Sequence, residues 1–465
     1  MKAAGFTCRG VVESEVRAAE SYRQNFAIEQ PGVPLCRLGP EEGNIRGINL
    51  TGVARDLSEE GLPPGNLDLL AAGPPCQGFS QVGRSKLNSL AQQRDAFRHD
   101  TRNQLYLGVV DLLSVLQPRA FIVENVTGVL NLGGVNVAER MIEAAERHGY
   151  CCRVAVLNAA WYGVPQTRER VFILGFREDL GITPSLPVPH YAVESYPGQL
   201  AGSDWVKKLF VDDSRLQILT KPGPGAPSAI SAQEAIGELP PLFDHLANGY
   251  SCKKAAQSEP LPYPATPIPG SYEELMRTWP DLPESTEVLD HYSRCTPRDH
   301  ETFRYMEHGD RYPDAVAVAE ERYAAALGRY RESQATTDEA MPEWGDYVPP
   351  YSVDSFEEKW RKLIPRQPSW TVTAHLCKDG YSHIHFDSAQ ARTITPREAA
   401  RLQSFPDAFR FSGNMGDKFR QIGNAVPPLL AAALGHQIQE ALESCDRTVE
   451  DQRQAETVAP HSTLA

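Results

Sequence analysis

The sequence predicts an α/β protein whose main domain is doubly wound around a parallel sheet, and three observations carry this prediction. Residues 120–123 (Ala-Phe-Ile-Val) are apolar without interruption, as in a parallel strand buried on both faces. Segments with helical periodicity flank this strand at residues 105–117 and 136–148. Glu124 then follows the strand, at the sheet edge where open α/β folds bind their ligands.

Composition bounds the class of protein. The 465 residues suffice for two domains, and no apolar run approaches the roughly 20 residues that span a bilayer. The N-terminus lacks the apolar core of a signal peptide, and the nine cysteines form neither a disulfide framework nor a CxxC metal pair. These features favour a reducing cytoplasm. The net charge of −14 is weak evidence against a nucleic-acid partner, because phosphate binding needs local Lys and Arg rather than a basic total.

The N-terminal segment predicts the end of a helix, a strand around residues 11–12 and a helix over residues 16–26. Glu13 follows the strand directly. In a doubly wound fold, an acid at the end of the second strand binds the ribose of a nucleotide-like cofactor. Taken alone, however, one such Glu is usually a solvated surface residue. Further on, residues 55–57 (Arg-Asp-Leu) predict a polar turn, in which Asp56 would equally suit a helix cap.

The loop around Cys76 is the centre of the predicted site. A strand at residues 67–71 ends abruptly in Gly-Pro-Pro, because neither proline can donate a hydrogen bond to a sheet. Cys76 therefore lies on a stiff turn at the mouth of the sheet. A lone cysteine is more often a small buried hydrophobic residue. A rigid turn is nevertheless how a nucleophile is held in place, and an activated thiolate is a strong nucleophile.

The next segment, residues 81–102, is rich in polar and basic residues and contains Gly83. Such a loop would be mobile whether or not it has a function. A helix over residues 105–117 follows, with leucines and a valine near helical spacing.

Two more strands are predicted, at residues 150–158 and 171–175. Between them, Gln166, Arg168 and Arg170 alternate along an extended segment, which places all three on one face. The plain interpretation of this pattern is a basic strand edge.

Residues 176–365 change in character. Prolines and glycines cluster there, and one charged, alanine-rich helix is predicted at residues 315–333. Basic residues between 291 and 304 interleave with aromatic ones, a pattern that suits contact with phosphates and bases. An ordinary solvated surface is about equally compatible with it.

The C-terminal part has clearer signals. Thr395, Pro396 and Glu398 predict a helix start with a capping box. A second helix is predicted to run to about Glu443, and the polar residues 446–465 are predicted to be disordered.

The seven residues around Cys76, Pro-Pro-Cys-Gln-Gly-Phe-Ser, resemble the nucleophile motif of the DNA cytosine-5 methyltransferases. Further motifs follow in that family's order. They are Tyr-Arg-Gln-Asn-Phe at 22–26, Glu-Asn-Val at 124–126, Gln-Thr-Arg-Glu-Arg at 166–170, the block from Thr395 to Pro406, and Phe-Arg-Gln-Ile-Gly-Asn-Ala-Val-Pro-Pro at 419–428.

The resemblance implies a role for individual residues. Cys76 would be the nucleophile, Glu124 in protonated form would bind cytosine N3, Arg168 would orient the base, and Arg170 would support the site. The implied cosubstrate is S-adenosylmethionine, with no metal. Its expected ligands are Glu13, Ser14, Asp56, Leu57, Pro75, Leu105, Asn424 and Val426. The residues expected to contact DNA are Gln81, Arg84, Arg102 and Gln166.

The resemblance also implies the domain organisation. Residues 1–178 would form a Rossmann-like methyltransferase domain, 179–390 a smaller mixed target-recognition domain with linkers, 391–445 a hinge and a returning helix, and 446–465 a tail. The family opens with an Asp-Leu-Phe-x-Gly-x-Gly-Gly strand and loop that the chain lacks, which we interpret as a start codon placed too late. The alternative is a truncated, impaired DNA-binding paralogue, and a tRNA methyltransferase is a lesser one. The expected protein is cytoplasmic and nucleoid-associated, acts on double-stranded DNA as a monomer without a membrane, and accompanies a restriction or defence system.

Overall fold

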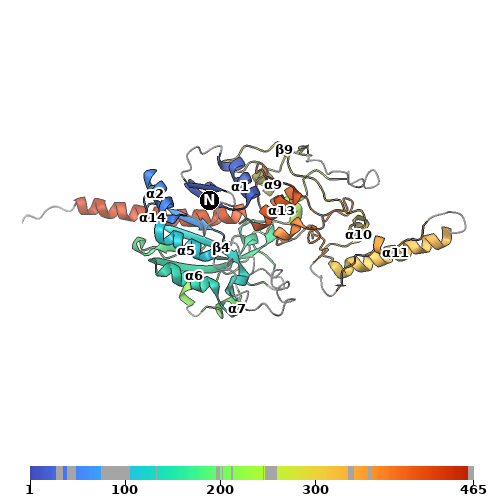
Figure 1. Ribbon diagram of the computed structural model, residues 1–465, viewed down its shortest axis with the longest axis horizontal. Helices are drawn as coiled ribbons and strands as arrows, with labels where there is room; N and C mark the ends of the chain where they lie inside the picture. Colours follow the sequence, from blue (N-terminus) through green and yellow to red (C-terminus); the bar gives the residue numbers. More distant parts are fainter. Residues whose placement is uncertain are drawn as a thin grey trace, which may run out of the picture. The chain divides into compact units, whose positions relative to one another are not determined.

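The computed structural model describes residues 1–27, 35–38, 49–74, 105–131, 134–194, 199–201, 203–210, 213–243, 246, 259–333, 340–353 and 359–458. Of residues 27, 35–38, 105, 204, 213, 449 and 451–458 it describes the backbone alone. The chain divides into two compact units. Figure 1 labels helices and strands of both. Unit 1 comprises residues 1–163, 168–228 and 428–465, and unit 2 comprises residues 164–167 and 229–427. The sequence predicts that the first domain ends at residue 178, whereas unit 1 continues to residue 228. Residues 391–427, predicted as part of a hinge with a returning helix, belong to unit 2.

Unit 1 contains a four-stranded sheet in the order β3-β4-β7-β5. Its strands are β3 (Leu69–Ala72), β4 (Ala120–Val126), β7 (Glu169–Arg177) and β5 (Tyr150–Asn158). A separate parallel pair consists of β1 (Gly10–Glu13) and β2 (Leu35–Leu38). Within the described part of the chain, no ladder joins this pair to the four-stranded sheet.

The sequence predicts a parallel sheet, whereas the four-stranded sheet is mixed. β3 and β4 are parallel, whereas β7 is antiparallel to both β4 and β5. The reason lies in the connection, because only ten residues, 159–168, separate β5 from β7. A parallel neighbour needs a crossover of about a dozen residues or more. The buried α/β architecture itself is confirmed, since Phe121, Val123 and Ile173 are all buried.

The pairing of β4 with β7 depends on one glycine. Phe121 lies opposite Gly175, and a Cβ on Gly175 would come within 2.2 Å of the Phe121 ring. The ring therefore occupies the space that a side chain at position 175 would need. Phe121 also meets Tyr150 edge to face at 5.2 Å between ring centroids, which extends this packing to β5.

The helices of unit 1 include one that the sequence did not predict. Helix α2 (Leu50–Glu59) begins at Asn49, whose side chain accepts a hydrogen bond from Gly52 N. The polar turn expected at residues 55–57 is thus wrong, because Val53 and Leu57 form a buried stripe that packs against Leu112 of α5. The other helices of unit 1 are α1 (Val16–Tyr22), α5 (Leu105–Leu116), α6 (Val137–Glu146), α7 (Asp204–Lys207) and α14 (Pro428–Val458).

Helix α14 returns the end of the chain to unit 1. It packs against the 3-10 turn Lys2–Ala4 so closely that a Cβ on Gly435 would lie 2.7 Å from that of Ala4. Arg119 donates to Asp446 at 2.5 Å, which fixes the helix beyond the Glu443 end that the sequence predicts. The tail expected from residue 446 is therefore helical as far as Val458.

Unit 2 is built from short elements. The capping box predicted at Thr395 is confirmed, because its hydroxyl accepts from Glu398 N while the Glu398 carboxylate accepts from Thr395 N. The predicted alanine-rich helix is also present, as α11. The helices are α8 (Ala232–Ile236), α9 (Tyr272–Arg277), α10 (His300–Tyr305), α11 (Tyr312–Ser333), α12 (Pro396–Leu402) and α13 (Met415–Asn424). The strands are β6 (Gln166–Thr167), β8 (Leu261–Pro262), β9 (Glu287–Val288) and β10 (Ser369–Trp370).

The described residues have three further features. None of their helices is long and apolar enough to cross a bilayer. They contain no cluster of three His, Cys, Asp or Glu side chains arranged to hold a metal ion. Cys295 is disulfide-bonded, which the cysteine spacing did not indicate.

Candidate active site

The carboxyl ends of β3 and β4 bring two predicted motifs together. The strands are parallel and Ala72, the last residue of β3, lies opposite Val123, so Gly73 follows β3 beside Glu124 of β4. A Cβ on Gly73 would lie 3.7 Å from Glu124 Oε2. Asn125 Nδ2 in turn donates to Pro74 O at 3.4 Å. The start of the Pro-Pro-Cys loop is thereby held against the Glu-Asn-Val segment.

Glu124 and Arg170 form an ion pair at this edge. Glu124 lies opposite Phe172 in the antiparallel β4–β7 ladder, so Arg170 is its diagonal neighbour on the same face. Arg170 Nε donates to Glu124 Oε1 at 2.9 Å, and Arg170 Nη1 donates to Glu169 O at 2.8 Å. An arginine–carboxylate contact of this length is a charge-assisted hydrogen bond, which holds the two side chains in a fixed relation.

Arg168 lies between β6 and β7 and is almost wholly buried. Its carbonyl accepts from Ala159 N at 2.8 Å, which fixes the backbone after the 3-10 turn Ala159–Tyr162. A buried guanidinium carries its charge into a region of low dielectric, where it acts strongly on any ligand that reaches it. This placement agrees with a role in orienting an anionic or electron-accepting group.

Gln166 lies elsewhere than expected. It is fully buried in unit 2, where Nε2 donates to Leu402 O at 2.7 Å and to Gln403 Oε1. Its Oε1 accepts from Val372 N at 3.0 Å. Direct contact of this amide with DNA is therefore wrong, since its polar atoms are used within the protein. Alternation along the chain gives no sign that other residues of unit 2 cover this side chain.

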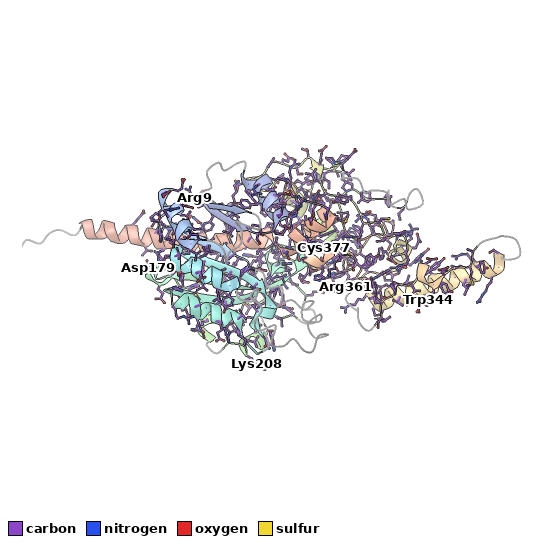
Figure 2. All side chains as sticks on the ribbon, viewed as in Figure 1. Arg9, Asp179, Lys208, Trp344, Arg361 and Cys377 are labelled. Atoms are coloured by element: carbon purple, nitrogen blue, oxygen red, sulfur yellow. The ribbon has the colours of Figure 1, made fainter. Side chains whose placement is uncertain are left out.

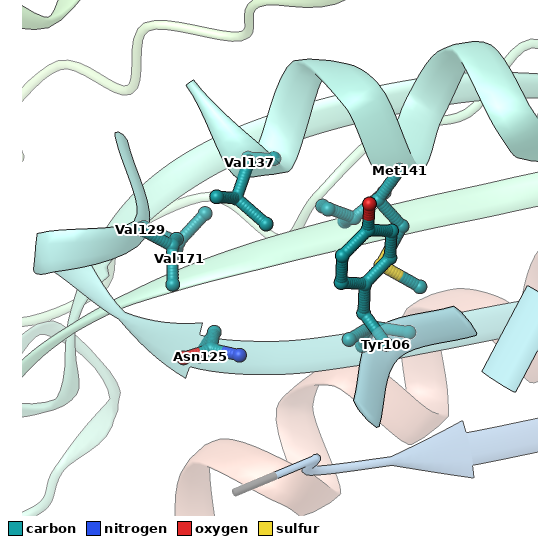
Figure 3. A pocket seen from close by; sticks show the side chains of 9 residues that line it. Tyr106, Asn125, Val129, Val137, Met141 and Val171 are labelled. Atoms are coloured by element: carbon teal, nitrogen blue, oxygen red, sulfur yellow. The ribbon is translucent and has the colours of Figure 1, made fainter. Parts of the chain in front are cut away.

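The opposite face of β4 is apolar. Successive residues of a strand point to opposite faces, so Asn125 faces away from Glu124. Figure 3 shows Asn125 at a small pocket whose wall includes Tyr106 from α5, Met141 from α6 and Val171 from β7. This packing fixes the end of β4 on the face opposite to Glu124, and so holds Glu124 in position.

Five predicted site residues lie outside the described residues. They are Pro75, Cys76, Gln81, Arg84 and Arg102. Their expected roles stay predictions.

The predicted cofactor residues lie at several places. Glu13 ends β1 at the carboxyl edge of the β1–β2 pair, and its Oε1 accepts from Glu15 N at 2.7 Å. Ser14, the next residue, is exposed. A partly exposed carboxylate at the carboxyl end of a parallel strand fits the ribose-binding role, because open sheets bind nucleotide-like ligands at that edge.

The remaining predicted cofactor residues are divided between the units. Asp56 is partly exposed on α2, whereas the buried Leu57 side chain faces the core beside α5. Leu105 is the first residue of α5. In unit 2, Asn424 ends α13 with its side chain exposed, and Val426 follows in the turn to α14.

Glu169 was missed by the sequence argument. Both of its carboxylate oxygens accept from backbone N–H groups, at 3.0 Å from Leu200 N and 3.0 Å from Ala201 N. It therefore fixes a distant loop to the strand that carries Arg170. The signal in the sequence is the acid itself, since Glu169 stands between Arg168 and Arg170.

The basic group at residues 291–304 is largely engaged inside unit 2. His291 is buried between Thr395 Oγ1 at 2.9 Å and Pro240 O at 2.7 Å. Arg294 donates to Leu376 O and Cys377 O, and Arg298 pairs with Asp299. These contacts favour a structural role over a DNA-binding face.

Comparison with known sequences gives a consistent result. The model of the family "C-5 cytosine-specific DNA methylase" matches residues 1–440. The type II methyltransferase M.AgeI of Thalassovita gelatinovora is 32% identical over 464 residues, which is 94% of this chain and 95% of that protein. A protein of Oceanobacillus iheyensis assigned the type II methyltransferase name M.OihORF3336P is 35% identical over 380 residues, or 81% of this chain and 80% of its own.

Comparison with solved structures supports the fold. A prophage-encoded protein of Escherichia coli, assigned as a DNA modification methyltransferase, matches with a TM-score of 0.58 and 20% identity. The match covers 95% of this chain and 94% of the other. At this identity the likeness shows the shared architecture alone.

Proposed function

The chain belongs to the C-5 cytosine-specific DNA methylase family, and from this we propose that it methylates C5 of cytosine in one double-stranded DNA sequence by covalent catalysis. The observation that carries the proposal is the meeting of Gly73 with Glu124 at the ends of β3 and β4. It ties the Pro-Pro-Cys loop to the carboxylate. Cys76 follows Pro74 by two residues of chain, which span at most about 7 Å. We propose that its sulfur thereby reaches a base bound at Glu124.

C5 of cytosine is too weak a nucleophile to take a methyl group directly. The protein must therefore supply a nucleophile that adds to the ring and activates C5. The Cys76 thiolate adds to C6, and the ring electrons move toward C5 and N3. Glu124, protonated at this step, donates a hydrogen bond to N3, which offsets the negative charge that the ring gains. Arg168 and Arg170 hold the base and its developing charge. When C5 has taken the methyl group, a water removes the C5 proton and the Cys76 sulfur leaves C6.

The methyl group comes from S-adenosylmethionine, which when bound supplies an electrophilic methyl on a sulfonium. Glu13 would hold the ribose hydroxyls, and Asp56 the adenine amino group. The other residues proposed to line this site are Ser14, Leu57, Pro75, Leu105, Asn424 and Val426.

The target base must leave the helix, because C6 is unreachable inside a duplex. Flipping costs a few kcal/mol, which contacts to the DNA backbone and to the vacated gap offset. We propose Gln81, Arg84 and Arg102 for these contacts. We further propose that the protein acts as a monomer on DNA of the nucleoid, together with a restriction or defence system.

The test is expression of residues 1–465 in bacteria that lack cytosine methylation, followed by bisulfite sequencing of their DNA. Protected cytosines in one recurring sequence are the expected result, and Cys76→Ser should abolish them. A Cys76→Ser variant with full methylation would refute covalent catalysis from this residue. Preference for tRNA over DNA in a competition assay would refute the proposal that double-stranded DNA is the substrate.

A further inference from the structure

Glu169 opens strand β7 and stands between Arg168 and Arg170, the two arginines proposed to act on the base. Within the described residues, its carboxylate accepts hydrogen bonds from two backbone N–H groups rather than from either guanidinium. Oε2 accepts from Leu200 N at 3.0 Å, and Oε1 accepts from Ala201 N at 3.0 Å. Hydrogen bonds from N–H groups to a carboxylate are charge-assisted and therefore strong. The side chain of Glu169 thus holds a backbone segment that begins 31 residues later in the chain.

The acid at the other end of β7 shows a different arrangement. Asp179, which Figure 2 labels, accepts from Arg177 Nε at 2.6 Å and from Arg177 Nη2 at 3.0 Å. This acid is exposed and neutralises the charge of an arginine close to it in the chain. Glu169 has an arginine on each side in the chain, and yet its oxygens meet backbone N–H groups. Its contacts therefore indicate support of the backbone rather than neutralisation of charge.

The backbone carbonyl of Glu169 contacts Arg170. Ala159 N donates to Arg168 O at 2.8 Å, which shows that the Arg168 carbonyl is directed toward β5. Carbonyls alternate in direction along an antiparallel strand, so the Glu169 carbonyl is directed toward β4. It accepts from Arg170 Nη1 at 2.8 Å, while Arg170 Nε donates to Glu124 Oε1 at 2.9 Å. The guanidinium is therefore oriented by two oxygens, a carbonyl of its own strand and the carboxylate of β4.

The carboxylate and the carbonyl of Glu169 belong to one residue, so fixing the first restrains the second. Ala201 is buried, which gives the carboxylate a firm support. Farther along the chain, Asn136 Nδ2 donates to Leu209 O at 2.8 Å and fixes that residue to the start of α6. The chain after β7 is thus attached at two separate points, one through Glu169 and one through Asn136.

We propose that Glu169 is a positioning residue for methyl transfer, which holds residues 200–201 and so fixes the carbonyl that orients Arg170. The inference rests on the proposed function, because Glu169 acts through an arginine of the same site. A guanidinium stabilises developing charge only from the correct place, and a displacement of about 1 Å can lower a rate about 100-fold. The interaction is needed in the transition state, so its loss should lower kcat rather than weaken DNA binding.

Two conservative variants of the full chain separate positioning from charge. Glu169→Gln loses the charge but keeps an oxygen in the place of Oε1, which accepts from both Leu200 N and Ala201 N. Glu169→Asp keeps the charge but is one methylene shorter, so it cannot reach both N–H groups without moving the strand. A positioning role predicts that Gln is the better substitute, whereas an electrostatic role predicts that Asp is.

The assay uses duplexes that carry the site found by bisulfite sequencing, and it measures kcat, KM and Kd for this DNA. For Glu169→Asp we expect a loss of about 10-fold in kcat, and for Glu169→Gln a loss of less than about 3-fold. The Kd of both variants should stay within about 2-fold of the wild type, because the DNA contacts remain.

Asn136→Ala is the matched control. It releases Leu209 from α6 and removes the side-chain cap of that helix, but it leaves β7 unchanged. It should lower the melting temperature, because a helix cap is lost, and retain the kcat of the wild type. Circular dichroism and thermal melting of every variant set an assay temperature at which all are folded.

A double variant tests whether Glu169 acts through Arg170. Lysine at position 170 carries one amine in place of the planar fork and cannot be oriented by both oxygens in the same way. In an Arg170→Lys background, measured in single turnovers, Glu169→Asp should therefore lower the rate by less than about 2-fold further.

Three outcomes would overturn the inference while leaving the proposed function intact. In the first, Glu169→Asp keeps the kcat of the wild type. In the second, Glu169→Gln loses as much kcat as Glu169→Asp or more. In the third, Glu169→Asp has its full effect in the Arg170→Lys background. Wild-type protein that methylates no DNA would instead refute the proposed function, and this inference with it.

Discussion

Arg170 Nε lies 2.9 Å from Glu124 Oε1, and each of these two side chains is only 14% exposed. The pair joins adjacent antiparallel strands at the edge where the Pro-Pro-Cys loop begins. Removing one partner of a nearly buried pair leaves an uncompensated charge. The same two groups are proposed to act on the base, so stability and catalysis are coupled at this point.

A double-mutant cycle separates the two roles. Arg170→Met should lower the free energy of unfolding by about 3 kcal/mol, because Glu124 then stays buried without its cation. The double variant Arg170→Met/Glu124→Gln should recover much of that stability and yet remain inactive. Chemical denaturation and methylation rates of the four proteins provide the measurement. Activity in the double variant would contradict the catalytic role of both residues.

Stability should depend on pH through three buried histidines of unit 2. Burial lowers the pKa of His383 and His385 to about 3 and that of His291 to about 4. Each is neutral in the folded protein, whereas in the unfolded chain it takes up a proton near its ordinary pKa of about 6.5. Their contribution to stability is therefore complete above about pH 7 and is lost as the pH falls toward 4, by up to about 1.4 kcal/mol per pH unit for each histidine.

Melting temperatures between pH 8 and pH 5 measure this dependence. His383→Gln should reduce the slope, because Gln does not titrate while its amide can still meet Ser382 Oγ and Trp370 O. A variant whose melting temperature falls as steeply as that of the wild type would show that His383 is not one of the groups responsible.

Arg401 should be indispensable for the stability of unit 2. Its guanidinium is fully buried and donates to Asp407 at 2.6 Å and to Glu238 at 2.7 Å. Arg401→Met removes the buried cation that these two acids share and leaves Glu238 with Arg277, and Asp407 with Tyr263 and Arg397. We expect a loss of about 3 kcal/mol, on the order of other broken buried pairs. Arg420→Met is the control, because the Arg420–Asp417 pair is exposed and worth at most about 0.5 kcal/mol. Urea denaturation of both variants tests the contrast.

Two glycines should respond to alanine in opposite ways. A Cβ at Gly423 of α13 would lie 2.2 Å from Ala374 N, so Gly423→Ala must push two backbone segments apart. Gly328 lies within α11 with no atom within 4 Å of such a Cβ, and Gly328→Ala should stabilise the helix by roughly 0.5–1 kcal/mol. Thermal melts that rank the two variants in the reverse order would contradict the close packing at Gly423.

Sequence alone predicted the elements whose signals are local. β5 occupies the predicted residues 150–158, and the capping box at Thr395 starts α12 where expected. Helix α2 was missed because Arg55, Asp56 and the following polar residues mask a stripe of only a few apolar positions. The direction of β7 was also missed, since it depends on the length of the connection rather than on the composition of the strand.

The sequence indicated which residue types belong to the candidate site, but not which of them pair with one another or are buried. Glu124 and Arg170 were expected at one edge, yet their ion pair arises from a diagonal register that sequence periodicity does not contain. Gln166 shows the same limit, because alternation indicates which face a residue shares and not what covers that face.

The order in which the chain is made has a consequence for unit 1. Its last element, α14, follows the whole of unit 2 in sequence, while the turn Lys2–Ala4 that it packs against lies more than 400 residues earlier in the chain. During translation the N-terminal segment must therefore wait until more than 400 residues have been added before it meets its partner helix. At a typical rate of about 5–20 residues per second, this delay lasts tens of seconds. Nascent chains of this protein should for that time be clients of the chaperones that bind exposed apolar segments.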